Sequence, residues 1–275
     1  MLPLAKANGQ LKALANYYTF RLRPVLIGSD SPQLLRDLAR DLTHMTRRIS
    51  LDGVGAEDGS VSRIEDAFGD AGWLVLRELC SVNHILEVNN RSYSEYLASR
   101  PGQLRTTLKR KAAKVRTLVL TAFDYEAWQA YEDIYRESWK PGEGSPAFLR
   151  AFAAAEGAAG RLRLGLAYAD GVPVAAQLWT VEAGTAWIHK LAHTEASKPL
   201  SPGTTLSAAL FAHVIDQDRV TTIDFGTGDD RYKRDWMEVV RARYRLDIVR
   251  PLHPGNWPII ARATLRRLAR AGKPG

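Results

Sequence analysis

The feature that most constrains the fold of this chain is a stretch of strand-like sequence over residues 161–193, interrupted twice by turn residues. Leucines alternate with Arg or Gly over residues 161–166, which is the period of a strand that buries one face. Asp170-Gly171 and residues 182–184 supply tight turns. Three consecutive antiparallel strands are therefore predicted, the last of them over residues 185–193.

After these strands the spacing of the apolar residues changes from that of a strand to that of a helix. Residues 199–203 predict a loop, and apolar residues spaced three and four apart predict a helix over residues 204–216. A short buried strand at 223–225 and an alternating strand at 243–249 follow. Antiparallel strands followed by a helix and further strands predict an α/β fold with a mixed (α+β) sheet.

The first 120 residues mix helices and short strands. Ser31-Pro32 is a favoured helix start, and the apolar spacing extends this helix to about residue 48. Residues 51–60 are rich in Gly, Asp and Glu and predict a loop, and separate strands are expected at 73–79 and 84–88. Further on, Asp124 caps a helix that ends near Lys140, with an apolar face formed by Trp128, Tyr131, Tyr135 and Trp139.

Composition excludes several classes of protein. The single cysteine, Cys80, rules out a disulfide framework and is typical of a reducing compartment. The longest apolar runs fall far short of the ~20 residues of a membrane span. The N-terminus has no apolar core of signal-peptide length, so a cytoplasmic protein is expected.

The positive charge is concentrated in two stretches. The chain carries +8, with seven basic residues in 100–116, five in 261–275, and no acidic residue in either. Without these twelve residues the net charge would be −4, unlike that of a uniformly basic nucleic-acid binder, so nucleic acid is not an expected partner. Residues 261–275 predict a basic amphipathic helix with Ile260, Leu265 and Leu268 as its apolar residues. It could contact an anionic membrane at the inner face, or simply be solvated or packed.

The first candidate site is the loop that enters the helix at residue 204. The first turn of a helix has backbone N–H groups without helical acceptors and the positive end of the helix dipole. The segment therefore predicts an anion site, and a plain strand-to-helix connection is the alternative. Its residues are Leu200, Ser201, Pro202, Gly203, Thr204 and Thr205.

The second candidate site is the segment Asp224–Lys233, where two glycines precede two carboxylates, a phenol and an ammonium. A carboxylate near a strand end can take a proton from an amine when burial raises its pKa. Lys233 could hold a carboxylate or phosphate of a substrate, or pair with Asp229 or Asp230. A solvated turn with local salt bridges is the alternative.

Two histidines of the third strand do not form a metal site. His189 and His193 would lie roughly 13 Å apart along a strand, too far for one ion, and no metal is expected. Either His189 or Lys190 would face the cleft, since neighbours on a strand point to opposite faces.

Four segments occur in order over a little more than 100 residues: Tyr168–Gly171, His189–His193, Leu200–Thr204 and Asp224–Lys233. In this order they resemble the GNAT acyltransferase fold, and within it the CelD-type cellulose-biosynthesis acetyltransferases and the related Fem-type aminoacyltransferases. The resemblance implies a reduced GNAT-like N-terminal lobe over residues 1–120, a GNAT lobe over 121–250 and a basic tail over 251–275.

The resemblance also implies an activity. It points to an acyl-CoA-dependent N- or O-acyltransferase, in the first instance an acetyltransferase. Acetyl-CoA or another acyl-CoA would give its acyl group directly to a small amine, an amino sugar, or a polysaccharide or cell-envelope precursor, without a metal. The CoA pyrophosphate would lie on residues 200–205.

The resemblance assigns roles to the second segment. Asp229 would be the base or orient the base, Lys233 would fix the substrate, and Tyr232 would protonate the leaving thiolate, which water could equally do. The other residues expected at the site are His189 beside the acyl group and Glu137, Trp139, Lys190 and Asp230 around the acceptor.

Two alternatives stay open. A Fem-type enzyme would take its acyl group from aminoacyl-tRNA, and the basic helix at 100–116 would then bind RNA phosphates. A non-catalytic GNAT-like accessory protein of an envelope or polysaccharide system would have lost binding of the donor.

Overall fold

The computed structural model describes residues 1–16, 18–28 and 31–271. The chain separates into two compact units, one made of Met1–Asn83 and Arg241–Gly275 and the other of His84–Val240. These divisions differ from the boundaries expected after residues 120 and 250. The difference arises because α3 (Tyr93–Ala98), α4 (Gly102–Lys111) and β5 (Arg116–Leu120) pack with the segments that follow them.

The His84–Val240 unit is built on a mixed sheet. The strands β5, β6 (Leu162–Ala169), β7 (Val172–Glu182) and β8 (Thr185–His193) pair antiparallel in succession, and β8 pairs in parallel with β9 (Thr222–Thr227). The end of β4 (Leu74–Glu87) lies along the other edge of β9. The three predicted hairpin strands and the α/β class are confirmed.

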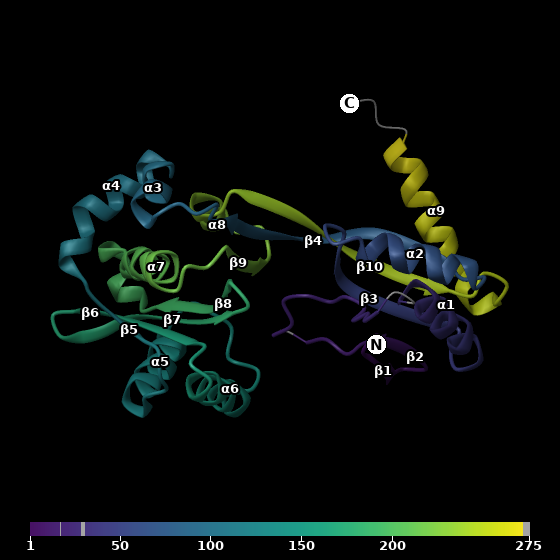
Figure 1. Cartoon of the computed structure of the whole chain (residues 1–275), viewed down its shortest axis with the longest axis horizontal. Coiled ribbons are helices and arrows are strands. Elements are labelled where there is room, and N and C mark those ends of the chain that lie inside the picture. The colour runs from purple at the N-terminus through teal and green to yellow at the C-terminus, as the bar shows by residue number, and fades with distance from the viewer. Residues whose placement is uncertain (17, 29–30, 272–275) are drawn as a thin grey trace. The chain divides into compact units, whose positions relative to one another are not determined.

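Helices cover both faces of this sheet (Figure 1). The helix α7 (Pro202–Ala212) lies on one face, and α5 (Tyr125–Glu137) and α6 (Pro146–Ala158) lie on the other. The predicted cap of α5 is confirmed, since the Asp124 carboxylate accepts a hydrogen bond from the Ala127 N–H at 2.8 Å. The helix α7 begins at Pro202, two residues before the expected start, and continues as a π-helical turn over His213–Gln217.

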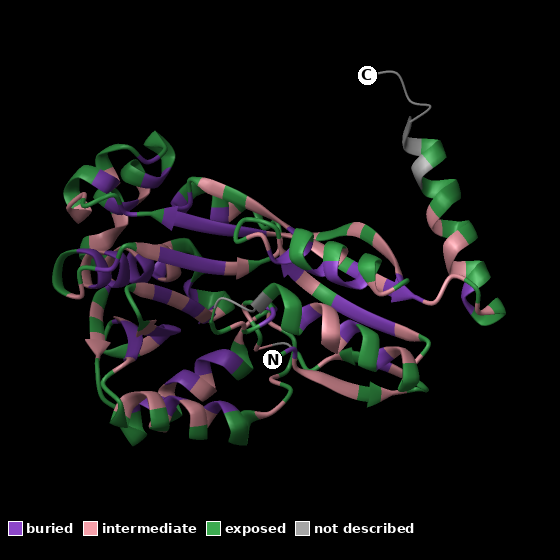
Figure 2. Ribbon diagram, turned by 45° about the vertical axis from the view of Figure 1, so that its right-hand side comes forward, coloured by how far each residue is buried: buried purple, intermediate pink, exposed green. Residues whose placement is uncertain are grey.

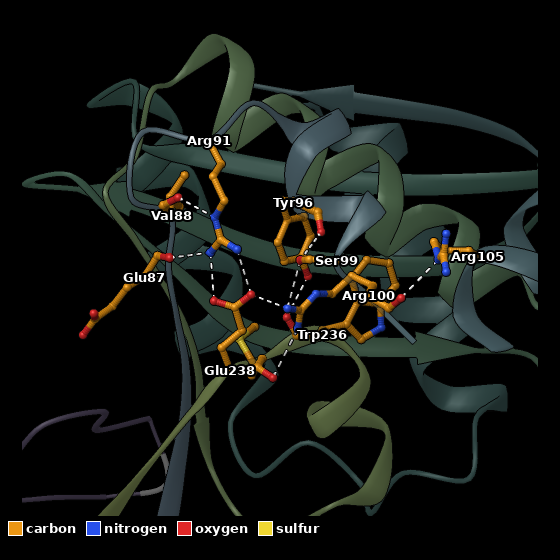
Figure 3. Close-up of polar contacts among 10 residues, drawn as sticks. Glu87, Val88, Arg91, Tyr96, Ser99, Arg100, Arg105, Trp236 and Glu238 are labelled. Atoms are coloured by element: carbon orange, nitrogen blue, oxygen red, sulfur yellow. Dashed lines mark hydrogen bonds and ion pairs between the residues drawn. The ribbon is translucent and has the colours of Figure 1, made fainter. Parts of the chain in front are cut away.

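An arginine network fixes α3 and the start of α4 (Figure 3). The Glu238 carboxylate accepts hydrogen bonds from Arg91, at 2.8 and 2.9 Å, and from Arg100. The Tyr96 hydroxyl donates to the Trp236 carbonyl at 2.7 Å, from the short helix α8 (Arg231–Trp236). Arg100 is therefore buried in a structural ion pair and does not belong to the exposed basic surface.

The other unit has its own core. Its strands are β1 (Leu4–Ala7), β2 (Gln10–Ala13), β3 (Arg48–Gly55), the C-terminal part of β10 (Val239–Val249) and the first part of β4. The helices α1 (Ser31–Asp41) and α2 (Ser60–Asp70) pack against one another, and α9 (Trp257–Ala271) ends the described chain. Figure 2 shows buried residues along the strands and on the inner faces of the helices.

Three expectations for the first 120 residues are wrong. The helix predicted to extend to about residue 48 ends at Asp41, a 3-10 turn follows over Leu42–His44, and β3 begins at Arg48. The loop predicted at 51–60 is a strand as far as Gly55, because Leu51 and Val54 are buried and pair with β10. The two strands predicted at 73–79 and 84–88 are one strand, β4. Its polar middle stays in the sheet because the Asn83 amide oxygen accepts a hydrogen bond from Arg243 at 2.8 Å. No helix in the described chain is long and apolar enough to cross a bilayer.

Candidate functional site

The strands β8 and β9 separate in the middle of the sheet. They pair only from Thr185 and Thr222 to Trp187 and Asp224, and β8 continues beyond this point. Just past the last pair, β8 contains a bulge: Ile188 pairs with Trp179 of β7 and Lys190 with Leu178, so that His189 is an extra residue.

The bulge changes the direction of two predicted site residues. The sequence predicted that only one of His189 and Lys190 faces each side, but both contact the α5–α6 layer, because the extra residue interrupts the alternation. The His189 ring lies 5.2 Å from Phe152, and its Nε2 is 2.8 Å from the Thr180 hydroxyl. Burial lowers the pKa of His189 to about 4, so its imidazole is neutral at pH 7.

Lys190 is held in a buried ion pair. Its ammonium lies 2.7 Å from a carboxylate oxygen of Glu143, in the connection between α5 and α6, and 5.6 Å from the centre of the Tyr135 ring. The side chains of Lys190 and Glu143 are 5% and 9% exposed. This pair holds the α5–α6 connection against β8.

The turn after β9 brings together the residues of the second segment. The Lys233 ammonium donates to the Thr227 carbonyl at 2.5 Å and lies 3.7 Å from the Asp230 carboxylate. Burial lowers the pKa of Lys233, although Asp230 opposes this effect. Gly228 has a φ of +102°, and a Cβ there would lie 3.4 Å from the Lys233 ammonium. The Tyr232 ring packs edge-on against Phe225.

Asp229 does not have the surroundings expected of a base. Its carboxylate is half exposed, and it accepts hydrogen bonds from the guanidinium group of Arg234 at 2.5 and 3.2 Å. These bonds, with a smaller contribution from His84, hold the pKa of Asp229 below its usual value. The carboxylate is therefore ionised at neutral pH and too weak a base to take a proton from an ammonium group efficiently.

The segment after α5 lies near the same lysines. Burial lowers the pKa of Lys140, and the neighbouring charge of Lys190 lowers it further. Trp139 is half exposed and packs against the His193 ring at 4.4 Å. Glu137 points elsewhere, into a groove on the outer face of α5 that Asp133 and Val172 also line.

The predicted anion site lies at the start of α7. Ser201 has a left-handed backbone (φ 53°, ψ 47°) and is followed by Pro202, which has no N–H. The amides of Gly203 and Thr204 lie in the first turn of α7, where a helix offers no acceptor of its own. Leu200 packs against the core, and the Thr205 N–H donates to the Ser201 carbonyl at 3.2 Å.

Two further residues lie at this site without any signal in the sequence that points to them. The Lys111 ammonium donates to the Ser201 hydroxyl at 3.0 Å and adds a cation to the positive end of α7. The buried Gln177 side chain donates to the Gly203 carbonyl at 3.1 Å and to the Ser207 hydroxyl at 2.8 Å. Lys111 lies in the basic stretch 100–116, but no local pattern distinguishes it from its neighbours.

His84 was also missed. It lies in the end of β4 and is 1% exposed, and its Nε2 is 3.1 Å from the Asp229 carboxylate. In the described chain no group of three His, Cys, Asp or Glu side chains is placed to hold a metal ion.

Known proteins share the architecture of this chain. Residues 96–234, just over half of the chain, match the family model described as acetyltransferase (GNAT) domain. No curated protein sequence matches the chain. Similar solved structures include L-PGS from Bacillus licheniformis (TM-score 0.61, 14% identity, 97% of this chain and 85% of that chain) and FemX (TM-score 0.64, 12% identity, 90% and 83%).

A third similar structure is the C-terminal domain of a putative lysylphosphatidylglycerol synthetase from Agrobacterium fabrum. Its TM-score is 0.61 at 12% identity, over 95% of this chain and 83% of that chain. At these identities the similarity shows a shared fold and does not extend to substrates.

Proposed function

We propose that this chain, which belongs to the acetyltransferase (GNAT) domain family, transfers an acyl group from an acyl-CoA to a small amine, an amino sugar or an envelope-polysaccharide precursor. Family membership makes it an acyltransferase; the donor and the acceptor are our proposal. Acetyl-CoA is the donor that we would test first.

The start of α7 carries the proposal for the donor. The dipole of α7 and the Lys111 ammonium both present positive charge at one place, and no carboxylate of the described residues pairs with Lys111. An anion between them would relieve this repulsion and accept hydrogen bonds from the Gly203 and Thr204 amides. The pyrophosphate of CoA supplies such an anion.

We expect the acyl group of the donor to lie where β8 and β9 separate. Past Trp187 and Asp224 the two strands no longer pair, so backbone groups there can bind a donor inserted between them. Lys140 and Lys233 lie near this region, and besides burial the charge of Lys140 lowers the pKa of Lys233. These two ammonium groups can attract and orient a carboxylate or phosphate of the acceptor, whereas Lys190 is already paired with Glu143.

A second candidate donor is aminoacyl-tRNA. Exposed cations of α4 and the turn after it, Arg105, Lys109, Arg110 and Lys114, pair with no carboxylate in the described chain. A polynucleotide could bind along this surface, and its affinity would then fall steeply with salt.

Calorimetric titration of CoA, acetyl-CoA, a longer acyl-CoA and bulk tRNA separates the two donors. For an acyl-CoA donor, Lys111→Ala weakens CoA binding about tenfold, the effect of one charge-assisted contact, whereas the control Lys109→Ala changes it less than twofold. For a tRNA donor, both variants weaken tRNA binding to a similar extent and CoA does not bind. Failure to bind either donor would favour a non-catalytic accessory protein.

A further inference from the structure

Asp229 and His84 are in hydrogen-bond contact, and the negative charge of Asp229 determines which ring nitrogen of His84 carries the proton. Two contacts hold Asp229 in its ionised form, one from Arg234 and one from His84. An ionised carboxylate only accepts hydrogen bonds, so Nε2 of a neutral His84 must carry its proton toward Asp229. Nδ1 then keeps the lone pair of the ring.

The Nδ1 atom of His84 is the unusual part of this pair. It is buried and has no hydrogen-bond partner among the described residues. Buried polar atoms are almost always hydrogen-bonded, so such a nitrogen is completed by a bound water or by a ligand. A lone pair in this position can take a proton from the amine that receives the acyl group, directly or through one water.

The position of His84 in the sheet places it near the proposed reaction. The Val88 N–H donates to the Thr221 carbonyl at 2.9 Å, just before β9 begins. Because β4 is next to β9 and runs past it in the opposite direction, His84 lies level with the C-terminal half of β9, where β8 no longer pairs. The Lys233 ammonium contacts the Thr227 carbonyl at this same end of β9.

We propose that His84 is the general base of the acyl transfer and that Asp229 is the positioning residue that fixes its tautomer. The inference rests on the proposed function, and it moves the base from Asp229 to His84. The acceptor ammonium gives one proton to His84 Nδ1, and the nitrogen lone pair forms a bond to the thioester carbonyl carbon. The C–S bond breaks with its electron pair on sulfur, and the thiolate takes the second proton of the nitrogen. His84 returns its proton to solvent.

Charged groups around His84 allow this role. Asp229 contacts the ring, and Arg234 acts through Asp229; both come from the segment after β9. On the β10 side, Glu238 donates its N–H to the Ile85 carbonyl at 3.1 Å but turns its carboxylate to Arg91 and Arg100. In the segment after β9, the Lys233 ammonium lies over the Phe225 ring and 3.7 Å from the Asp230 carboxylate.

The test measures release of the CoA thiol from acetyl-CoA with glucosamine as acceptor, over pH 5.5–9, in the full-length protein. His84→Gln is expected to lower kcat by roughly 10²–10⁴ near pH 7, with KM for acetyl-CoA unchanged, and to lower it less at pH 9, where more of the glucosamine is already the free amine. Asp229→Asn no longer fixes the proton on Nε2, so kcat should fall by a smaller factor, again with KM unchanged. Added imidazole should restore part of the activity of His84→Gln.

Each contrary result has a distinct meaning. Wild-type turnover and an unchanged pH profile in both variants would overturn the assignment to His84. If His84→Gln does not fold, the exposed Asp229→Asn variant decides: a wild-type kcat in that variant overturns the pair. Absence of both acetyl-CoA binding and transfer in the wild type would overturn the proposed function itself, and His84 with it.

Discussion

The Lys190 ammonium lies 2.7 Å from the Glu143 carboxylate, and both side chains are more than nine-tenths buried. The two residues come from β8 and from the connection between α5 and α6, so the ion pair closes a long loop of the chain. Neither charge has much access to water if the other is removed.

Glu143→Gln should therefore destabilise the protein. Leaving a buried ammonium without its counter-charge costs about 3–5 kcal/mol, which urea unfolding would measure as a lower free energy of unfolding. The matched control is Glu137→Gln, on the exposed face of α5, with an expected effect within about 0.5 kcal/mol. Equal stability of the two variants would show that the pair contributes nothing.

His189 should make the stability depend on pH. The pKa of His189 is about 4 in the folded protein and 6.5 in the unfolded chain. Between these two pH values only the unfolded chain binds a proton at this residue. Stability from this group is complete above pH 6.5 and is lost as the pH falls toward 4. At pH 4.5 the loss relative to pH 7 should be about 2–3 kcal/mol larger in the wild type than in His189→Gln. Parallel pH dependence of the free energy of unfolding in the two proteins would contradict this.

Gly203 should be needed for the approach of the donor and not for folding. A Cβ at this position would meet its nearest neighbour, the His193 ring, at 3.5 Å, an ordinary contact. Gly203→Ala should keep the wild-type melting temperature, and Gly203→Val should weaken CoA binding at least tenfold by covering the first-turn amides. Ser201→Ala should matter less, since the backbone makes the contact. Wild-type CoA affinity of Gly203→Val in calorimetry would exclude the start of α7 as the donor site.

The helix α9 should respond to anionic membranes. Trp257, Leu265 and Leu268 are each more than half exposed, next to Arg262 and the partly paired Arg266. Each basic residue near an anionic surface adds about 1 kcal/mol of attraction. Flotation with phosphatidylserine vesicles should carry the full chain and leave a variant without residues 261–275 behind, with phosphatidylcholine vesicles as the control. Equal flotation of both proteins would mean that α9 is simply a solvated helix.

The parts of the molecule that sequence predicted correctly depend on local periodicity. The hairpin strands from β6 to β8 follow from residue spacing, since neighbouring side chains decide which face is buried. The same holds for the buried aromatic residues of α5, whereas Trp139 of the predicted face lies beyond the end of α5 and is half exposed. The strand at 51–55 was missed because its pairing with β10 comes from nearly 200 residues away. Gly and Asp in a strand resemble a loop until the partner strand is known.

The same limit applies to the candidate site. Asp229 and Lys233 became candidates because they lie in one short segment of unusual composition. Lys111 meets Ser201 across 90 residues, and His84 meets Asp229 across 145, so only the folded chain brings these pairs together. The pairing with Arg234 also changes what Asp229 can do, and the composition of the segment does not reveal it.

The extra residue in β8 has a consequence for how this protein can vary. Two residues of β8, His189 and Lys190, lie opposite the single residue Leu178 of β7. Deleting His189 would leave Lys190 opposite Leu178 in a regular ladder, so Lys190 would stay on the side of Glu143 and His193 on the side of Trp139. Only the contacts of residue 189 with Phe152 and Thr180 would be lost. Position 189 should therefore accept the loss of a residue, whereas an insertion or deletion elsewhere in β8 would turn the later side chains to the wrong face.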